Sequence, residues 1–517
     1  MLQDGYLPLD GPAGQRLIDY SWAGYQNGAV ALPQPASPGV DVQALGADPS
    51  GATDSTAAIQ QAIDQVAAAG GGTVWLPKGL YRVDGTLLVQ AADTVLRGAG
   101  AALTRLHFTR HEKMSFAAHL TFRGKPKADV VALPYVAPGS TVDPNAAWTD
   151  DVVTLPPGAT LAVGDEVALT QLVTEGFVAE HGMTGTWKAF AGDRVRIWRS
   201  RVAAVAPAAG GGVALSLQPA FPGVVRHRDQ PRIERITGYL KSCGVVDLAV
   251  GNAVDWEAAW AQDQVAAIAF EGAADGWALR VESFDPPGPQ SEGVMPGAHL
   301  QSAGIRIHDS TRMTVQDCHL QKAQNRGGGG NGYLFEIRQS THVLTRGCSG
   351  RHGRHNFIQN WGFGTAACVW SGILSEGGKA MFSPLTDLAP TGFSEFHHSL
   401  AMFNLIEDSV LHDGWAAQNR GDESSGAGHT ATETTMWNLR GDGVLISRNY
   451  GHGYVIGTAP SLQLTTSTAA DGLSKGGLGT EPVDWVEGAG VGASLWPQSL
   501  WACQRAHRLG LGSCGAP

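Results

Sequence analysis

Charged residues are scarce in this chain of 517 residues, because Asp, Glu, Lys and Arg make up 16 % of it, against about 25 % in an average soluble domain. The sequence therefore predicts little of the charged surface that long exposed helices present. No apolar run approaches the roughly 20 residues that a membrane-spanning helix needs, which excludes insertion into a membrane. The net charge of −11 excludes a partner bound through a broad cationic surface, such as duplex nucleic acid.

Metal-binding patterns are also missing. The six cysteines form no CxxC pair and no zinc spacing, so they are interpreted as buried thiols plus at most one disulfide, for which Cys503 and Cys514 are the candidates. Calcium stays possible in principle, but no tight cluster of three or more acidic residues occurs to bind it. We therefore expect no metal and no cofactor.

Glycine is abundant, with 69 residues, nearly twice the usual share of about 7 %. Hydrophobic residues make up 43 % of the chain, which is enough for a large core and excludes global disorder. Short strands joined by many turns would produce this combination.

One amphipathic helix is predicted near the start of the chain. Asp54 or Ser55 can cap it, apolar side chains recur at helical spacing from Ile59 to Val66, and the glycine run 70–72 ends it. Only short strands follow. We interpret the helix as a cap over the open end of a sheet structure, because an uncovered strand end exposes backbone donors and apolar side chains.

The same region resembles a known family. The segments GADPSGATDSTAAIQQAID (46–64), GGGTVWLPKGLYRV (70–83) and LRGAG (96–100) resemble the N-terminal part of the pectate-lyase-like superfamily. The resemblance implies a right-handed parallel β-helix, an all-β solenoid. It implies no single reaction, because lyases, glycoside hydrolases, epimerases and phage tailspikes share this opening.

An internal repeat supports the solenoid independently. Residues 304–307 (GIRI) are echoed by 334–337 (LFEI), and Cys318 is echoed by Cys348, always 30 residues apart. A fixed period of this length indicates stacked units that bury their apolar faces against one another. The two cysteines are predicted to lie one above the other, facing inward as small apolar groups.

Four regions follow from these patterns. Residues 1–149 are expected to form the helical cap and the first coils, and 232–460 the main β-helix with the site. Between them, 150–231 alternates apolar and polar residues around tight turns, which predicts a small inserted antiparallel β subdomain. Residues 461–517 are expected to pack along the outside of the solenoid.

Candidate site residues concentrate between about 319 and 457. A basic group of Arg351, Arg354, His355 and Asn356 stands out in an acidic chain and could neutralise a carboxylate, with Arg420 as a second clamp. The glycine-rich stretch 324–333 before it is interpreted as a flexible turn.

Histidines supply the proton-exchange candidates, because imidazole titrates near neutrality. They are His397, His398 and His429. Since neighbouring residues of a strand point to opposite faces, we expect at most one of the adjacent pair to face a groove.

Carboxylates supply an alternative, because glycosidic hydrolysis needs a pair of them about 5 to 9.5 Å apart. Two tryptophans nearby could stack on sugar rings. The acidic candidates are Asp413, Asp422, Glu423 and Glu433, and the tryptophans are Trp415 and Trp437.

Three functions therefore stay open. The first is a polysaccharide lyase that cleaves an acidic glycan by β-elimination, with His397, His398, Arg354 and His355 as its catalytic candidates. The second is a glycoside hydrolase or transglycosylase, including the fructotransferase type, with Asp413 and Glu433 as its best carboxylates. The third is a glycan-binding β-helix without catalysis.

The expected partner in each case is a poly- or oligosaccharide, and self-association stays open. We expect a secreted or periplasmic bacterial protein. The residues LQDGYLPLDG after Met1 lack the basic start and apolar stretch of a signal peptide, so a cytoplasmic location also stays open.

Overall fold

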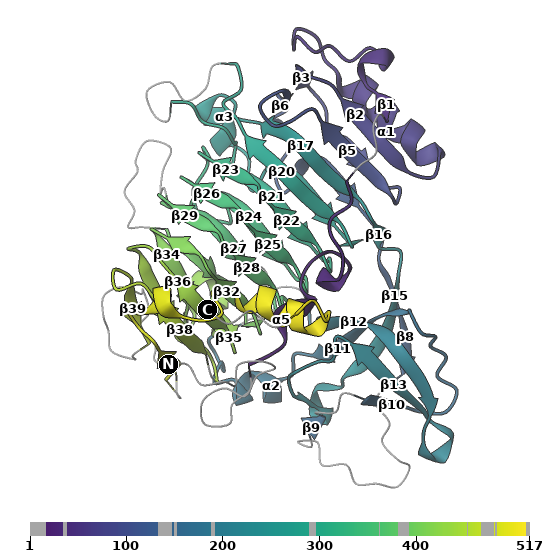
Figure 1. Cartoon of the computed structure of the whole chain (residues 1–517), viewed down its shortest axis with the longest axis vertical. Helices are drawn as coiled ribbons and strands as arrows, with labels where there is room; N and C mark the ends of the chain where they lie inside the picture. The colour runs from purple at the N-terminus through teal and green to yellow at the C-terminus, as the bar shows by residue number, and fades with distance from the viewer. Residues whose placement is uncertain are drawn as a thin grey trace.

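The computed structural model describes residues 17–34, 39–132, 147–148, 152–187, 192–288, 296–360, 362–380, 392–451, 453–466, 480 and 483–512. These residues form a right-handed parallel β-helix, as the sequence predicts. Two long parallel sheets run along it (Figure 1), one of 18 strands and one of ten in the part of the chain described.

The ten-stranded sheet carries the candidate site. Its strands, in spatial order, are β4 (Leu87–Val89), β7 (Ala118–Arg123), β18 (Ala266–Glu271), β21 (Ala303–His308), β24 (Tyr333–Arg338), β27 (His355–Gln359), β30 (Ser394–Phe396), β34 (Gly414–Ala417), β37 (Val444–Ser447) and β39 (Gln463–Thr465).

The larger sheet forms the other long wall. Its strands are β1 (Val40–Asp41), β2 (Gly72–Leu76), β3 (Gly79–Val83), β5 (Thr94–Gly98), β6 (Thr104–Phe108), β17 (Gly244–Gly251), β20 (Trp277–Ser283), β22 (Thr314–Gln316), β23 (His319–Gln321), β25 (Leu344–Arg346), β26 (Ser349–Arg351), β28 (Val369–Ser371), β29 (Leu374–Glu376), β32 (Leu405–Glu407), β33 (Val410–Leu411), β36 (Thr435–Leu439), β38 (Tyr454–Thr458) and β40 (Trp485–Glu487). Short parallel pairs, β16 (Leu240–Lys241) with β19 (Ala273–Ala274) and β31 (Ala401–Met402) with β35 (Ala431–Thr432), line a third side.

The 30-residue repeat is the register of the stacked strands. Ile305 of β21 pairs with Phe335 of β24, and the same offset joins β22 to β25 and β23 to β26. At the corner between coils, the hydroxyls of Thr311 and Thr341 lie 3.2 Å apart. One repeat is thus one turn of the solenoid, which confirms the prediction.

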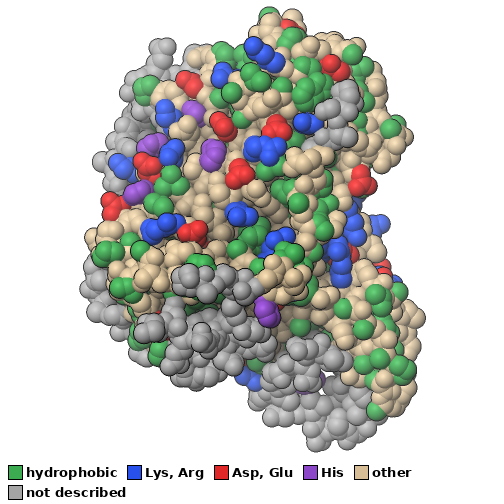
Figure 2. All heavy atoms as spheres, in the orientation of Figure 1, with side chains coloured by type: hydrophobic (Ala, Val, Ile, Leu, Met, Phe, Trp, Pro, Cys, Tyr) green, Lys and Arg blue, Asp and Glu red, His purple; other side chains and the backbone are tan. Residues whose placement is uncertain are grey.

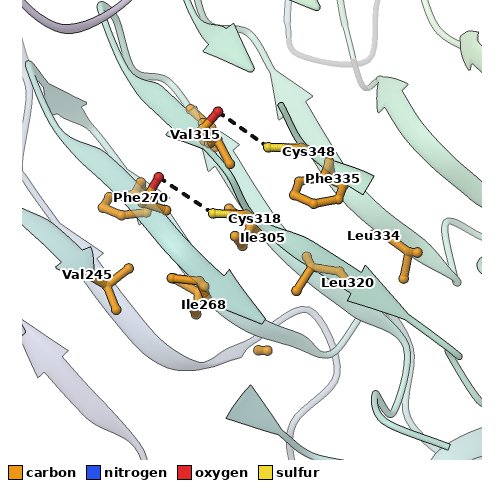
Figure 3. Close-up of a cluster of buried hydrophobic side chains, with 14 of the residues drawn as sticks. Val245, Ile268, Phe270, Ile305, Val315, Cys318, Leu320, Leu334, Phe335 and Cys348 are labelled. Atoms are coloured by element: carbon orange, nitrogen blue, oxygen red, sulfur yellow. Dashed lines mark hydrogen bonds between the residues drawn. The ribbon is translucent and has the colours of Figure 1, made fainter. Parts of the chain in front are cut away.

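Cys318 and Cys348 stack inside the solenoid, as predicted. Both are at most 1 % exposed, and each thiol donates to a backbone carbonyl, of Ala278 and Val315 respectively. Figure 3 shows them among inward apolar side chains that include Phe335. Cys514 lies outside the described residues, so its bridge to Cys503 stays a prediction.

The predicted helix forms as α1 (Thr56–Ala68), with Ser55 at its N-cap position. Its buried face, which includes Ile59, Ile63 and Val66, joins the same core cluster as the first strands. Figure 1 shows it beside β1 and β2 at one end of the stack. Its role as a cap stays a prediction.

An antiparallel sheet projects from the side of the solenoid (Figure 1). It contains the predicted hairpins, β10 (Val152–Leu155), β11 (Glu166–Leu172), β12 (Arg194–Pro207) and β13 (Val213–Gln218), together with β8 (Lys127–Ala132) and β15 (Arg232–Thr237). The helix α2 (Glu175–Glu180) follows β11. We call this unit, from β8 to β15, the inserted sheet.

A buried ionic joint ties the inserted sheet to the solenoid. Arg312, 2 % exposed, donates to Glu166 of β11 at 2.7 Å and to Asp275 at 2.8 Å. Arg201 of β12 reaches the same two carboxylates. Breaking such a pair from one side leaves an uncompensated buried charge, which is strongly destabilising.

The helix α5 (Leu500–Arg508) lies outside the large sheet, where Leu500 and Trp501 pack with Leu405 and Trp437. In the described residues, no helix has the length and apolarity to cross a membrane. On the face drawn in Figure 2, cationic and anionic side chains of the described residues alternate, with no broad basic area.

Candidate active site

The outer face of the ten-stranded sheet carries ionisable side chains on adjacent strands. In the strand pairing, Glu336 of β24 lies beside Ile358 of β27, and Ile358 lies beside Glu395 of β30. The two glutamates therefore lie in one row of residues that runs across the strands. Their strand neighbours belong to the core cluster, and alternation therefore turns this row outward. Arg338 follows Glu336 two residues later on the same face, and His397 follows the end of β30 in contact with Glu395.

Glu395 lies between two imidazoles. Its Oε1 is 3.3 Å from Nε2 of His355 and in short contact with Nδ1 of His397. The other ring nitrogen of His355 lies 2.6 Å from the carbonyl oxygen of Phe393. All three residues are less than one-tenth exposed, so the packing fixes their mutual geometry.

Two guanidinium groups border this cluster. Nη1 of Arg420 lies 2.7 Å from Nδ1 of His397 and 3.8 Å from Oε1 of Glu395. Arg354 precedes His355 and donates through Nη1 to the carbonyl of Gly327 at 2.6 Å. The glycine-rich stretch, interpreted as a flexible turn, thus positions a basic side chain at the cluster.

Two further rings complete the site. The ring centroid of Tyr333 is 5.4 Å from that of His355 and 6.5 Å from that of His397. His398 stacks on His397, with centroids 4.8 Å apart. The expectation that adjacent histidines would point to opposite faces is wrong, because β30 ends at Phe396 and strand alternation stops there.

Burial keeps the imidazoles neutral. It lowers the pKa of His355 to about 3, an effect that Glu395 opposes and Arg354 reinforces. Burial, followed by the charge of Arg420, also holds the pKa of His397 well below its usual range. The pKa of the Tyr333 phenol rises to about 12, again through burial. The site therefore pairs neutral bases with a protonated phenol.

The donor set could also be read as a metal site. One ligand atom each from His355, Glu395 and His397 lies within 4.8 Å of the others, and two histidines with one carboxylate suit several divalent ions. The Arg420 guanidinium, however, already contacts His397, and its fixed positive charge opposes a cation there. We therefore assign no ion to this cluster.

Two of the predicted polar residues lie inside the solenoid. Asp413 is 2 % exposed, and its Oδ2 accepts hydrogen bonds from Nδ2 of Asn356 at 2.8 Å and from the backbone N–H of Gly378 at 3.0 Å. Burial raises the pKa of Asp413 to about 6. The predicted catalytic role of Asp413 and binding role of Asn356 do not fit this placement. The two side chains instead form a hydrogen-bond network inside the solenoid.

The predicted sugar platforms are also buried. Trp415 belongs to the core cluster inside the coils, and Trp437 packs under α5 with its Nε1–H donating to the carbonyl of Pro497. Both are 0 % exposed. The prediction that they stack on a sugar is wrong in this structure, because neither ring has a free face.

Other predicted residues lie around the cluster or away from it. Glu423 contacts Arg420 at 3.7 Å, and Asp422 beside it is exposed. His429 packs edge-on against Tyr450. Arg351 belongs to β26 of the other long sheet, where it pairs with Glu376.

Glu433 lies at a separate cavity of about 430 Å³, whose lining includes Tyr20, Trp198 and Phe403. The side chain opens into this cavity, yet the surrounding protein raises the pKa of its carboxyl group to about 7. Asp413 is buried and does not line this cavity, so the two carboxyl groups do not face a common space.

Sequence reasoning missed Tyr333, Glu395, Glu336 and Arg338. A usable signal was present, since Glu-x-Arg in 336–338 and Glu-x-His in 395–397 place two ionisable groups on one face of a strand.

The start of the chain matches a known family of proteins. Residues 39–126 match the family described as "Rhamnogalacturonase A/epimerase, pectate lyase-like", which confirms the resemblance seen in the N-terminal sequence. The match covers α1 and the first coils. The strands of the candidate site lie beyond it.

Curated relatives match over short stretches. Over 71 residues the chain is 62 % identical to mannuronan C5-epimerase AlgE3 of Azotobacter vinelandii and 45 % identical to alginate lyase 7 of the same organism. Each alignment covers 12 % of this chain, and they span 4 % and 8 % of those proteins. The chain thus matches less than a tenth of the length of either relative.

Among solved structures, the A-module of mannuronan C-5 epimerase AlgE6 from A. vinelandii aligns over 87 % of this chain and 98 % of its own, at 13 % identity and a TM-score of 0.36. An exopolygalacturonase from Thermotoga maritima aligns over 85 % and 94 %, at 10 % identity and a TM-score of 0.41.

Proposed function

We propose that this chain is a carbohydrate-active enzyme that removes the proton α to the carboxylate of a uronate residue, with β-elimination as the outcome. The observation that carries the proposal is the pair of neutral imidazoles, His355 and His397, set beside two guanidinium groups on one sheet face. A base, a cationic clamp and an acid are what this reaction needs.

The first step is recognition of the carboxylate. Arg354 and Arg420 flank the imidazoles, and a guanidinium fork matches the two oxygens of a carboxylate. Negative charge develops on this group when the neighbouring proton leaves, so the same contacts strengthen during the reaction. A substrate carboxylate would also raise the pKa of the imidazoles toward the range of an effective base.

The second step moves two protons. An imidazole nitrogen of His355 or His397 accepts the proton from C5. The electron pair of the broken C5–H bond then forms the C4–C5 double bond as the C4–O4 bond breaks. The Tyr333 phenol, 5.4 Å by ring centroid from His355, donates a proton to the departing O4. Return of a proton to the opposite face of C5, before O4 leaves, would give epimerisation instead.

Hydrolysis is the second candidate, because Glu336 and Glu395 share an outer row two strands apart, or about 9.5 Å between backbones. That suits a water-mediated pair. However, Glu336 accepts two hydrogen bonds from Arg338, and a hydrolase also needs a protonated carboxyl group. Carboxyl groups whose pKa burial raises, among them Asp413, Glu407 and Glu433, lie elsewhere.

A substrate panel tests the proposal. The names of the relatives motivate oligo- and polymannuronate, to be assayed beside polygalacturonate and neutral glucans. Elimination produces an ultraviolet-absorbing unsaturated uronate together with each new reducing end. New reducing ends without that absorbance would favour hydrolysis, and no change in any acidic glycan would overturn the proposal.

A further inference from the structure

A second cavity, of about 440 Å³, lies where the inserted sheet meets the outer face of β21 and β24. Arg194, Arg196 and Arg199 of β12 line it from one side, and His308 and Asp309 from the other. Neither the substrate clamp nor the acid–base cluster uses any of these residues. We call it the β12 cavity.

The charges of the β12 cavity do not balance. Asp309 is shared by two guanidinium groups, with Nη1 of Arg196 at 2.8 Å and Nη2 of Arg199 at 2.6 Å. Arg194 donates through Nη1 to the carbonyl of Gln230 at 2.9 Å. The other lining carboxylate, of Glu234, accepts from the Thr170 hydroxyl at 3.3 Å. Three cations thus face two anions.

Two guanidinium nitrogens at the β12 cavity lack a hydrogen-bond partner among the described residues. They are the buried Nη1 of Arg199 and Nη2 of Arg194. The Arg199 residue is 2 % exposed. Buried polar atoms are nearly always bonded, so an orphan calls for an unseen partner. The partner that fits a guanidinium edge is an oxyanion such as a carboxylate.

The β12 cavity shares a sheet face with the acid–base cluster. His308 pairs with Arg338 on the next strand. On the two strands after that, the last paired residues are Gln359 and Phe396, and the residues that follow them are Asn360 and His397. Three strand spacings separate the ends of this row, about 14 Å. Both side-chain polar atoms of Asn360, between the two ends, also lack a partner within the described part of the chain.

We propose that the β12 cavity is a distal subsite that binds the carboxylate of another uronate residue on the same substrate chain. The inference rests on the proposed function, because it assumes an acidic polymer lying along this face. It predicts that binding depends on the length of the substrate. Short oligomers bind at the acid–base cluster alone, and longer oligomers also bind in the β12 cavity.

Calorimetric binding of oligomannuronates of two and of six residues tests the subsite. It is done with the His397→Gln chain, in which the proposed chemistry is blocked. We expect the added change Arg194→Gln to weaken hexamer binding about tenfold, as loss of one charged hydrogen bond does, and to leave dimer binding unchanged. Arg194→Lys keeps the charge without the planar fork and should fall between the two.

Arg105→Gln is the matched control. Arg105 is exposed on β6, a strand of the other long sheet, so this substitution also removes one positive charge but does so away from the cavity. Equal hexamer affinity with and without Arg194→Gln would overturn the subsite. So would an equal loss with Arg105→Gln, which would indicate a nonspecific charge effect. Turnover of short oligomers by the unmodified chain reports separately on the proposed function.

Discussion

Nη1 of Arg420 lies 2.7 Å from Nδ1 of His397, and Glu395, two residues earlier in the chain, contacts the same ring nitrogen. The imidazole is therefore held between a cation and an anion. A fixed positive charge beside a buried imidazole disfavours its protonation. A bound uronate would add a negative charge at this point and reverse that bias.

Replacing either imidazole should abolish most turnover. We expect His355→Gln and His397→Gln each to lower kcat by about 10²- to 10⁴-fold, the usual contribution of a general base. The measurement is initial rate on the active glycan, with circular dichroism to verify folding. His319→Gln, on an exposed position of β23, is the control. Rates within twofold of the unmodified chain for both variants would remove these residues from the chemistry.

Arg420→Gln should change both binding and pH dependence. Removing the guanidinium raises the pKa of His397, because Arg420 lowers it. A base must be deprotonated to act, so the acidic limb of kcat/KM should move to higher pH, and KM for a uronate should rise. The pH–rate profile measures both effects. Arg440→Gln, at an exposed ion pair with Asp408, should shift neither.

Buried histidines should make the protein sensitive to acid. Burial lowers the pKa of His119 and His342 to about 3, and the two rings lie away from the site. Their folded-state pKa is below the ordinary 6.5, so the stability they contribute is present above pH 6.5 and is lost as pH falls toward 3. At pH 5 each would cost roughly 2 kcal/mol.

Thermal unfolding between pH 7 and pH 4 measures this loss. His119 stacks on Phe108, so His119→Phe keeps the packing and removes the titration. The variant should lose less Tm between these pH values than the unmodified chain. Parallel pH curves for the two proteins would show that His119 is not protonated on unfolding.

Glu433 predicts the opposite pH trend. The surrounding protein raises its folded-state pKa to about 7 by desolvation, although the residue itself is exposed at its cavity, so the folded protein favours the protonated form. The related stability is present below about pH 4.5 and is lost as pH rises through 7. Glu433→Gln should therefore raise Tm more at pH 8 than at pH 5, as scanning calorimetry would measure. Asp422→Asn, exposed on a nearby loop, should not.

The repeat predicted the fold well because it reports directly on register. Two matched segments 30 residues apart require the strands to pair at that offset, and Ile305 with Phe335 does so. The basic group and the adjacent histidines were found because ionisable residues are rare in this chain. Their density marked the region that we treat as the candidate site.

Inside and outside could not be separated from sequence. Asn356 and Asp413 bond to each other inside the coils. Strand alternation did not reveal this, because Phe357, next to Asn356, also lies in the core. Trp415 and Trp437 were misplaced for the related reason that an aromatic ring suits a core and a sugar platform equally well.

Loss of deuterium from C5 is the most direct measure of the central claim. A polyuronate labelled with deuterium at C5 is incubated with the unmodified chain and with Tyr333→Phe and His397→Gln, and the label is followed by NMR. The proposed chemistry predicts that turnover by the unmodified chain removes the label, with a primary isotope effect, and that both variants largely retain it. Chain shortening that leaves the C5 label in the product would contradict proton abstraction at this site.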